Sequence, residues 1–223
     1  MRVISLLLVA SLLSSPALGA CPSVDGPNPC FLYKYQRNTE YFVIANHNPV
    51  ACDDELIKAA QDWTNAGSKF RLSQYPEYPT TYINNSVADP YFKVSFEGQY
   101  YMVNGINRTA ESLYKQYNGY TVVNGESLWL TTDGDVRVNN DFYANKRILC
   151  ENKAAIDPYQ NQVDFGKIIA EEFGHSHGQG HITTTNCAMT NPTRAGTMYS
   201  NICATEADAV RRLFATDTYP IYR

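Results

Sequence analysis

Hydrophobic residues recur at helical spacing in the segment from Asp54 to Gly67, and this spacing predicts a helix with one buried face. The apolar positions of that face are Leu56, Ile57, Ala60 and Trp63. Asp53 or Asp54 can cap the start of the helix through a side-chain oxygen, and Gly67 suits its end. The segment therefore predicts an amphipathic helix that packs against a core through Trp63.

Two later segments predict helices by the same pattern. The first begins after Asp164, a favourable capping residue. Its apolar positions are Phe165, Ile168, Ile169 and Phe173. The second opens at residues 205–208. Its core face consists of Ala207, Val210, Leu213 and Phe214. Both segments predict helices that bury one side.

Alternation of apolar and polar residues, the pattern of a strand with one buried face, occurs in two places. Between Phe92 and Phe96 the apolar residues alternate with Lys93 and Ser95. Residues 135–139 alternate in the same way. Both segments therefore predict strands that cover a core with one side only.

The segment from Glu171 to His181 carries the clearest chemistry in the chain, with the sequence EEFGHSHGQGH. Glu171 and His175 are four positions apart, so a helix places both on one face, where they can bind one metal ion. Glycine readily adopts positive φ, so Gly178 can end the helix and let His181 approach the same ion. Three protein ligands and one open position are the arrangement of catalytic rather than structural zinc.

Glu172 lies next to the face that carries these ligands. From there its carboxylate can take a proton from a water molecule that the metal has made more acidic, which is the role of a general base. A carboxylate ligand such as Glu171 cancels one more unit of metal charge than an imidazole does, leaving a weaker Lewis acid. His177 occupies a variable position and faces away from His175, so we do not expect it to bind the metal.

This segment resembles the zinc-protease motif H-E-x-x-H-x-x-G-x-x-H of the metzincin clan, and it departs from the motif only where Glu171 replaces the first histidine. The resemblance covers roughly residues 31–217 and is to metzincins of the matrixin-like kind. It implies an α/β (α+β), zincin-like domain with a twisted mixed five-stranded sheet, an active-site helix and a C-terminal helix. It also implies that Glu171, His175 and His181 bind the metal and that Glu172 is the general base.

Two further expectations follow from the resemblance. Residues 195–200 resemble the Met-turn of the clan, in which Met198 would pack beneath the metal ligands without touching substrate. The strand at 135–139 stands where the family has the edge of the sheet above the cleft, to which an extended peptide substrate adds as a strand. An ordinary edge strand protected by charge is the alternative interpretation.

Residues 1–20 have the features of a signal peptide: Arg2 precedes an apolar core, and small residues follow at 15–20. The apolar run is too short to span a membrane, so we expect no transmembrane segment. Residues 21–223 would then form a single catalytic domain that is secreted, either extracellular or periplasmic. The formal net charge of −4 argues against nucleic acid and anionic membranes as partners.

Six cysteines in an exported protein suggest three disulfides. Of the possible pairs, Cys187 with Cys203 is expected, because this bridge would clamp the loop of the Met-turn. A competing interpretation concerns Cys21, since residues 18–21 resemble a bacterial lipobox. In that case Cys21 would carry a lipid anchor and would not form a disulfide.

These observations predict a secreted zinc-dependent endopeptidase that acts as a monomer on protein or peptide substrates. Zn²⁺ is the expected cofactor, and Ca²⁺ is left open as another. The alternative is a pseudoprotease that only binds proteins or peptides. The replacement at Glu171 favours this alternative, because a Glu four residues before a His also forms an ordinary ion pair on a helix. The presence of Glu172 opposes it, because a site without catalysis has no chemical need of that carboxylate.

Iron is a further possibility, since two histidines and one carboxylate can hold it. The general base and the Met-turn fit hydrolysis better. Replacing Glu171 by His restores the ligand of the family, so the sequence predicts that this variant keeps or raises metal affinity.

Overall fold

The structure is a computed structural model of the 223-residue chain, and it describes residues 29–31, 33–35, 42–46, 49–67, 91–97, 102–103, 106–123, 126–150, 156–191, 196 and 201–214. Residues 1–20, Cys21 and Met198, on which three of the predictions rest, lie outside these ranges. The elements follow in the order β1 (Tyr33–Tyr35), β2 (Phe42–Asn46), η1 (Val50–Cys52), α1 (Asp53–Asn65), β3 (Tyr91–Glu97), β4 (Met102–Val103), β5 (Ile106–Asn107), β6 (Ala110–Val123), β7 (Glu126–Asn139), α2 (Asn140–Ala144), β8 (Ile148–Leu149), η3 (Pro158–Gln160), β9 (Val163–Asp164), α3 (Phe165–Ser176) and α4 (Ala204–Phe214).

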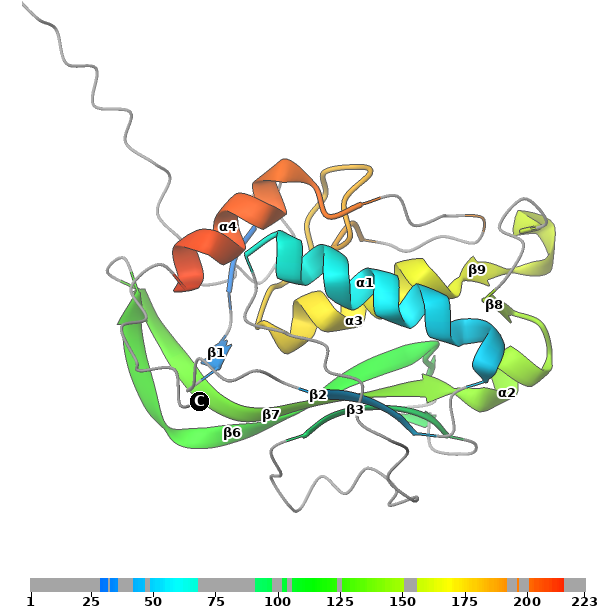
Figure 1. Ribbon diagram of the computed structural model, residues 1–223, viewed down its shortest axis with the longest axis horizontal. Coiled ribbons are helices and arrows are strands. Elements are labelled where there is room, and N and C mark those ends of the chain that lie inside the picture. Colours follow the sequence, from blue (N-terminus) through cyan, green and yellow to red (C-terminus); the bar gives the residue numbers. More distant parts are fainter. Residues whose placement is uncertain are drawn as a thin grey trace, which may run out of the picture.

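The principal sheet is built around β7, which forms a long curved ribbon with the antiparallel strand β6 (Figure 1). The other edge of β7 pairs in parallel with β1 and with β3, and β2 extends the sheet beyond β3. Five strands take part, but β1 and β3 occupy successive stretches of the same edge of β7. The sheet is therefore mixed, as predicted. Because two of its strands share one edge of β7, no part of the sheet is five strands wide, and the expectation of a five-stranded sheet is corrected in this sense.

The strand at 135–139 is part of β7 and is not an edge, contrary to the sequence-based expectation. β3 pairs with one of its sides and β6 with the other. Among the described residues, β6 has β7 as its strand partner and lies at the margin of the sheet. The edge position was expected from the resemblance to the family. The alternation of residues 135–139 indicates which side chains are buried, but it does not indicate which strands lie on either side.

Helices α1 and α3 pack against each other over one face of the sheet, and α4 lies at one end of this layer (Figure 1). The predicted apolar face of α1 is confirmed at Leu56, Ala60 and Trp63, whereas Ile57 is only half-buried. The predicted apolar positions of α3 and α4 are all buried. The Trp63 indole donates to the Ala170 carbonyl oxygen at 2.8 Å and so joins α1 to α3.

The predicted cap of α1 is wrong. The N-cap is Cys52, which makes no side-chain cap bond, because the 3₁₀ turn η1 leads directly into the helix. Asp53 and Asp54 lie in the first turn instead, where their negative charges interact favourably with the helix dipole and stabilise the helix. The prediction for α3 is confirmed, since the Asp164 side chain accepts from the Gly166 N–H at 3.1 Å.

Close contact between α1 and α3 depends on Gly174. A Cβ atom at this position would come within 2.0 Å of the Met189 sulfur and 2.9 Å of the Trp63 ring. Both neighbours are fully buried, so neither has free space into which to move. Gly174 therefore lets the metal-motif helix lie close to the core on the side away from the cleft.

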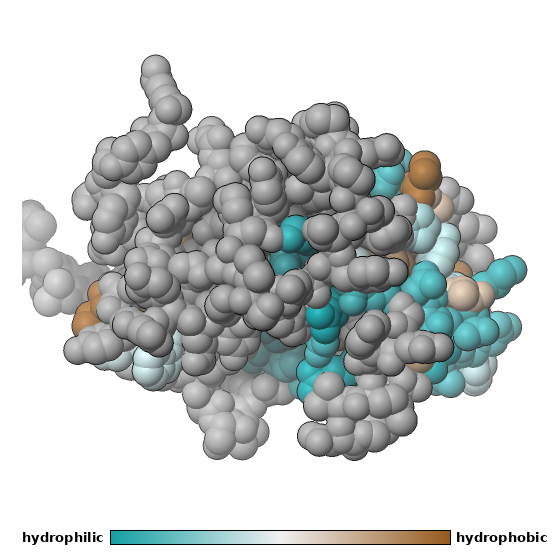
Figure 2. All heavy atoms as spheres, turned by 90° about the horizontal axis from the view of Figure 1, so that it is seen from below, coloured by the Kyte–Doolittle hydropathy of each residue, from teal (hydrophilic) through white to brown (hydrophobic). Residues whose placement is uncertain are grey.

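The sheet face away from the helices is partly buried as well. Val94 and Phe96 point toward the helices, and Phe96 contacts the Phe165 ring of α3. Ser95 and Glu97 point the other way but are also buried, so the prediction of a single buried face for β3 is wrong. Figure 2 views the molecule from this side, and most of the described residues visible there are hydrophilic.

Two disulfides join described cysteines. The predicted bridge Cys187–Cys203 is confirmed, and Cys52 is bonded to Cys150. Cys30 is disulfide-bonded too. Within the described residues, no helix is long and apolar enough to cross a membrane.

Candidate metal centre

The residues predicted to bind metal come together in the structure. Glu171, His175 and His181 each offer a donor atom, and these atoms all lie within 4.8 Å of one another. Glu171 and His175 are one turn apart on α3, as the four-residue spacing requires. His181 follows the helix by five residues and reaches the same point from the other side.

The turn that brings His181 into place is a Schellman motif, the common hydrogen-bonded ending of an α-helix. Gly178 has a φ of 87°, and its N–H donates to the His175 carbonyl oxygen at 2.7 Å. The Gln179 N–H donates to the Gly174 carbonyl oxygen at 3.0 Å. This pair of bonds defines the motif, and the positive φ explains the need for glycine. The predicted role of Gly178 is confirmed.

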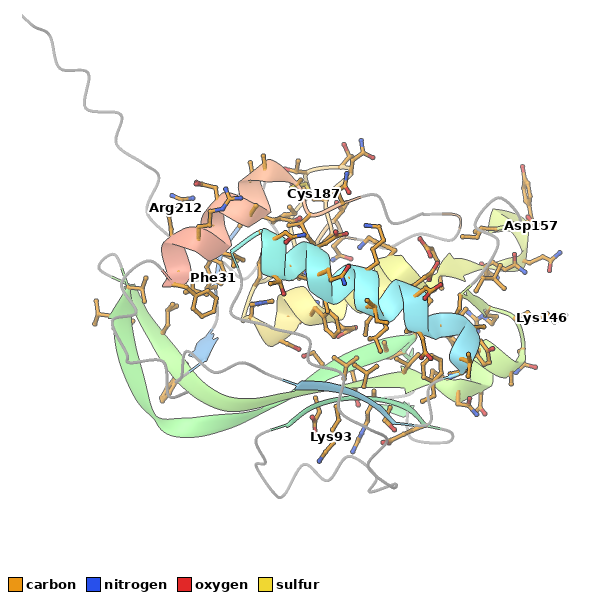
Figure 3. All side chains as sticks on the ribbon, viewed as in Figure 1. Phe31, Lys93, Lys146, Asp157, Cys187 and Arg212 are labelled. Atoms are coloured by element: carbon orange, nitrogen blue, oxygen red, sulfur yellow. A yellow bond between two sulfur atoms is a disulfide. The ribbon has the colours of Figure 1, made fainter. Side chains whose placement is uncertain are left out.

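The N-terminal part of the described chain holds this turn from outside. The Gly180 N–H donates to the Cys30 carbonyl oxygen at 3.1 Å, and Phe31 forms an antiparallel bridge with Gln179. Figure 3 shows Phe31 between the sheet and the helical layer. The segment before His181 is thus fixed on both sides.

Hydrogen bonding orients the His175 ring for metal binding. Its Nδ1 lies 2.9 Å from the Gln179 carbonyl oxygen, which can only accept, so Nδ1 carries the proton. The lone pair is then on Nε2, which lies 3.0 Å from Nε2 of His181. Burial, and after it the neighbouring His181, lower the pKa of His175, so the ring is neutral and able to donate to a metal.

Glu171 divides its two carboxylate oxygens between different partners. Oε1 lies 3.1 Å from Nε2 of His181, on the side of the two histidines. Oε2 accepts from the Lys167 ammonium at 2.6 Å. Lys167 is 2% exposed and also donates to the Ala188 carbonyl oxygen at 2.5 Å. Sequence analysis overlooked Lys167, although a lysine four residues before Glu171 in an otherwise apolar helix face was a usable signal.

Glu172 is buried beside the ligands, and its Oε2 has no hydrogen-bond partner among the described residues. Burial, and after it repulsion from Glu171, raise the pKa of Glu172 to about 8, while a backbone hydrogen bond from Ser112 of β6 acts in the opposite direction. Glu171 and Glu172 line a cleft of about 240 Å³. Its other lining residues are Arg108, Thr109, Ala110, Val163 and Ile168.

His177 lies on the opposite side of the turn, as predicted. Its ring is buried. The ring centroid lies 4.9 Å from that of Trp63 and 6.2 Å from that of Phe214. Its Nδ1 lies 2.6 Å from the Phe173 carbonyl oxygen, and burial lowers the pKa of His177 to about 3. His177 is therefore a neutral core residue and not one of the grouped donors.

The loop from Cys187 to Met189 lies beside the site and is anchored by Glu206 of α4. The buried Glu206 carboxylate accepts from the N–H groups of Ala188, Met189 and Cys203 at 2.7 to 3.0 Å. The Cys187–Cys203 disulfide joins the same two segments, and Figure 3 shows Cys187 next to the start of α4. Sequence analysis missed Glu206, because its partners are backbone groups that come from a different segment.

Two of the three donor separations fit a small divalent cation. Tetrahedral zinc with nitrogen ligands at about 2.0 to 2.1 Å has its donor atoms about 3.3 Å apart. The separations of 3.0 Å between the histidine nitrogens and 3.1 Å from His181 to Glu171 are close to this value. Two imidazoles and one carboxylate form an established catalytic zinc ligand set, and they also suit iron.

The structure alone brings these side chains together, and comparison with known proteins gives no further information about them. No known protein-family profile matches the chain, and no curated protein sequence matches it.

Proposed function

We propose that this protein is a secreted zinc-dependent endopeptidase of the metzincin clan, matrixin-like in its catalytic domain. One observation carries the proposal. The donor atoms of Glu171, His175 and His181 converge, and beside them the buried Glu172 has a carboxylate oxygen without a partner among the described residues. Convergent ligands next to a buried carboxylate with one unpaired oxygen are what a metal-assisted hydrolase requires.

Zinc bound to these residues would polarise a substrate carbonyl and make water in the site more acidic. Glu172 supplies the base: its Oε2 can accept a proton from water and later pass it to the leaving amine. Burial raises the pKa of Glu172, so its carboxyl group holds a proton more readily than that of an ordinary glutamate. His175 keeps its lone pair toward the metal through the bond from Nδ1 to Gln179.

A peptide substrate has a binding edge next to this chemistry. β6 is antiparallel to β7 and lies at the margin of the described sheet. Its first residue, Ala110, and the preceding Thr109 line the cleft. An extended peptide can add to such an edge through backbone hydrogen bonds, which bind any sequence. The substrate strand expected at 135–139 is accordingly reassigned to β6.

Export is supported by the disulfides between described cysteines, because such bonds persist in oxidising compartments. The signal peptide at 1–20 remains a prediction from the sequence.

A second candidate function, a non-catalytic module that binds peptides in the same cleft, is favoured by the Lys167–Glu171 ion pair. This pair occupies one oxygen of Glu171 and would hold the helix together without any metal. The two functions differ in what happens to a bound peptide.

The deciding experiment combines zinc analysis with a cleavage assay. The purified protein and its Glu172→Gln variant are each analysed for zinc and incubated with a peptide library that is read out by mass spectrometry. Asp208→Asn, which changes an exposed carboxylate of α4, serves as the control. We expect about one zinc per chain in all three proteins and cleavage by the wild type and the control only. Bound zinc without cleavage by the wild type would establish the binding module instead, and absence of zinc would refute both the ligand set and the enzyme.

A further inference from the structure

We propose that Lys167 is a built-in counter-cation for Glu171, so that the two side chains together present the metal with a neutral ligand in place of a histidine. In this role Lys167 is a positioning residue that acts through Glu171. The inference rests on the proposed function in one respect: it takes Glu171, His175 and His181 as the metal ligands.

The burial of Lys167 is the first observation. The side chain is 2% exposed, although lysine is rarely buried without a partner. Its ammonium group donates to Glu171 Oε2 at 2.6 Å and to the Ala188 carbonyl oxygen at 2.5 Å. An isolated buried ammonium group would be strongly unfavourable, so Lys167 needs the negative charge of Glu171 nearby.

The division of the Glu171 oxygens is the second observation. Lys167 donates to Oε2, and Oε1 lies 3.1 Å from Nε2 of His181. A carboxylate held in this way presents Oε1 to a metal more readily than Oε2. Lys167 would therefore favour binding of a metal through one oxygen of Glu171, and three protein donor atoms with an open position are what catalytic zinc requires.

Charge is the third consideration. A metal bound by three neutral imidazoles keeps its full double charge, whereas a carboxylate ligand reduces the formal charge by one. The ammonium group of Lys167 adds this charge back directly behind the carboxylate. The site that departs from the family motif at Glu171 thus has the same formal charge as the motif with histidine.

Lys167 is held in place independently of the metal. Its second partner, the Ala188 carbonyl oxygen, belongs to a loop whose N–H groups at Ala188 and Met189 donate to Glu206. The Cys187–Cys203 disulfide closes the same loop. The cation is therefore already positioned before any metal arrives.

This arrangement reverses one expectation from the sequence. Glu171→His alone restores the family ligand, but it removes the carboxylate that is bonded to the buried ammonium group of Lys167 and leaves that ammonium group near a doubly charged metal. Glu171→His should therefore weaken zinc binding. Changing Lys167 to Met in the same protein should restore it, because both charges of the pair are then absent.

The test is a double-mutant cycle of wild type, Lys167→Met, Glu171→His and the double variant, with zinc affinity measured by competition with a chromophoric chelator. We expect Glu171→His to lose about 10- to 100-fold in affinity, the range for changes next to metal ligands. The double variant should recover most of this loss. Lys167→Met alone should bind zinc about tenfold more tightly than wild type, because a positive charge near the metal is gone. Lys58→Met, which removes the lysine of an exposed (i, i+4) pair with Asp62 on α1, is the matched control and should bind zinc as wild type does.

Cobalt substitution reports the coordination directly. With Co²⁺ in place of zinc, Lys167→Met should show weaker visible absorption than wild type, because Glu171 is released to bind through both oxygens and raises the coordination number. A lysine that only supported the fold would not shift this spectrum toward higher coordination, and its removal would weaken zinc binding.

The outcomes separate the two proposals. If the wild type holds no zinc, the proposed function fails and this inference fails with it. If the wild type binds zinc but the double variant binds no more tightly than Glu171→His, only the counter-cation role is overturned. Should Glu171→His not fold, Lys167→Met decides alone: tighter zinc binding supports the role, and weaker binding refutes it.

Discussion

Glu206 of α4 and Glu172 of α3 are both buried glutamates, but their carboxylates have opposite hydrogen-bonding environments. The two oxygens of Glu206 accept three backbone N–H groups, from Ala188, Met189 and Cys203. Glu172 faces the cleft, and its Oε2 lacks a partner within the described part of the chain. Burial raises the pKa of both carboxyl groups, so burial and pKa alone do not distinguish them.

The difference lies in the donors around each group. A buried carboxylate surrounded by backbone N–H groups fixes the segments that supply them, and its function is structural. A buried oxygen without a donor costs roughly 1 to 3 kcal/mol of stability, and such a cost in a folded protein calls for an explanation. The proposed role of Glu172 as a general base in the cleft would provide one. The predictions that follow test this distinction.

Glu172→Gln should have the largest effect, and the effect should be on activity. Loss of a general base typically lowers the rate by about 10²- to 10⁴-fold. Stability should not fall, because the amide removes a buried ionisable group that has an unpaired oxygen. The measurement is kcat/KM on a cleaved peptide together with urea unfolding. Retention of activity would remove Glu172 from the mechanism.

Removing the Cys187–Cys203 disulfide by Cys→Ala changes at both positions should lower the free energy of unfolding by about 3 kcal/mol, as expected for a loop of this size. Zinc affinity should rise, because the loop that carries Ala188 holds the positive charge of Lys167 near the metal ligands. The matched control removes Cys52–Cys150 instead. It should lose stability but keep zinc affinity, and equal changes of affinity in both variants would contradict a local role for the loop.

Glu206→Gln should lower the free energy of unfolding by about 1 to 3 kcal/mol. The amide replaces one acceptor oxygen with an NH₂ group that faces backbone N–H donors. Activity per folded molecule should change far less than in Glu172→Gln. Asp208→Asn on the exposed side of the same helix should stay within about 0.5 kcal/mol of wild type in the same urea unfolding experiment.

Ser112→Ala should have the smallest effect. Its hydroxyl lies 2.7 Å from the Ser176 hydroxyl and links β6 to α3, a bond worth about 1 kcal/mol. The bond from Ser112 to Glu172 comes from the backbone and survives the change. Thermal unfolding and kcat/KM should show a slightly less stable enzyme with most of its activity. An activity loss as large as that of Glu172→Gln would mean that the hydroxyl prepares Glu172.

The sequence predicted the grouping of the candidate metal ligands, because this grouping depends on local structure. Glu171 and His175 share a helix face through their spacing, and Gly178 ends the helix through its own φ, so both features depend only on neighbouring residues. The expectation that His177 is not a metal ligand also followed from its place in the motif, and the structure places its ring beside that of Trp63.

The sequence failed where distant segments meet. It assigned the sheet edge to 135–139, although that strand lies between β3 and β6. It also gave no indication that Cys52 is bonded to Cys150, 98 residues away. Alternation identifies strands, and a cysteine count predicts disulfides. Neither indicates which strands pair or which cysteines are bonded to each other.

The sequence by itself determined the spacing of Glu171, His175 and His181, the helix that carries the first two and the glycine turn that returns the third. Local backbone geometry is sufficient for all of these. Only the tertiary structure decided that Lys167 has the Ala188 carbonyl as its second partner, that Glu206 anchors the loop behind it and that Glu172 lies under β6. These contacts join residues that are far apart in the chain, and their energies depend on burial, which arises only when the helices and the sheet pack together.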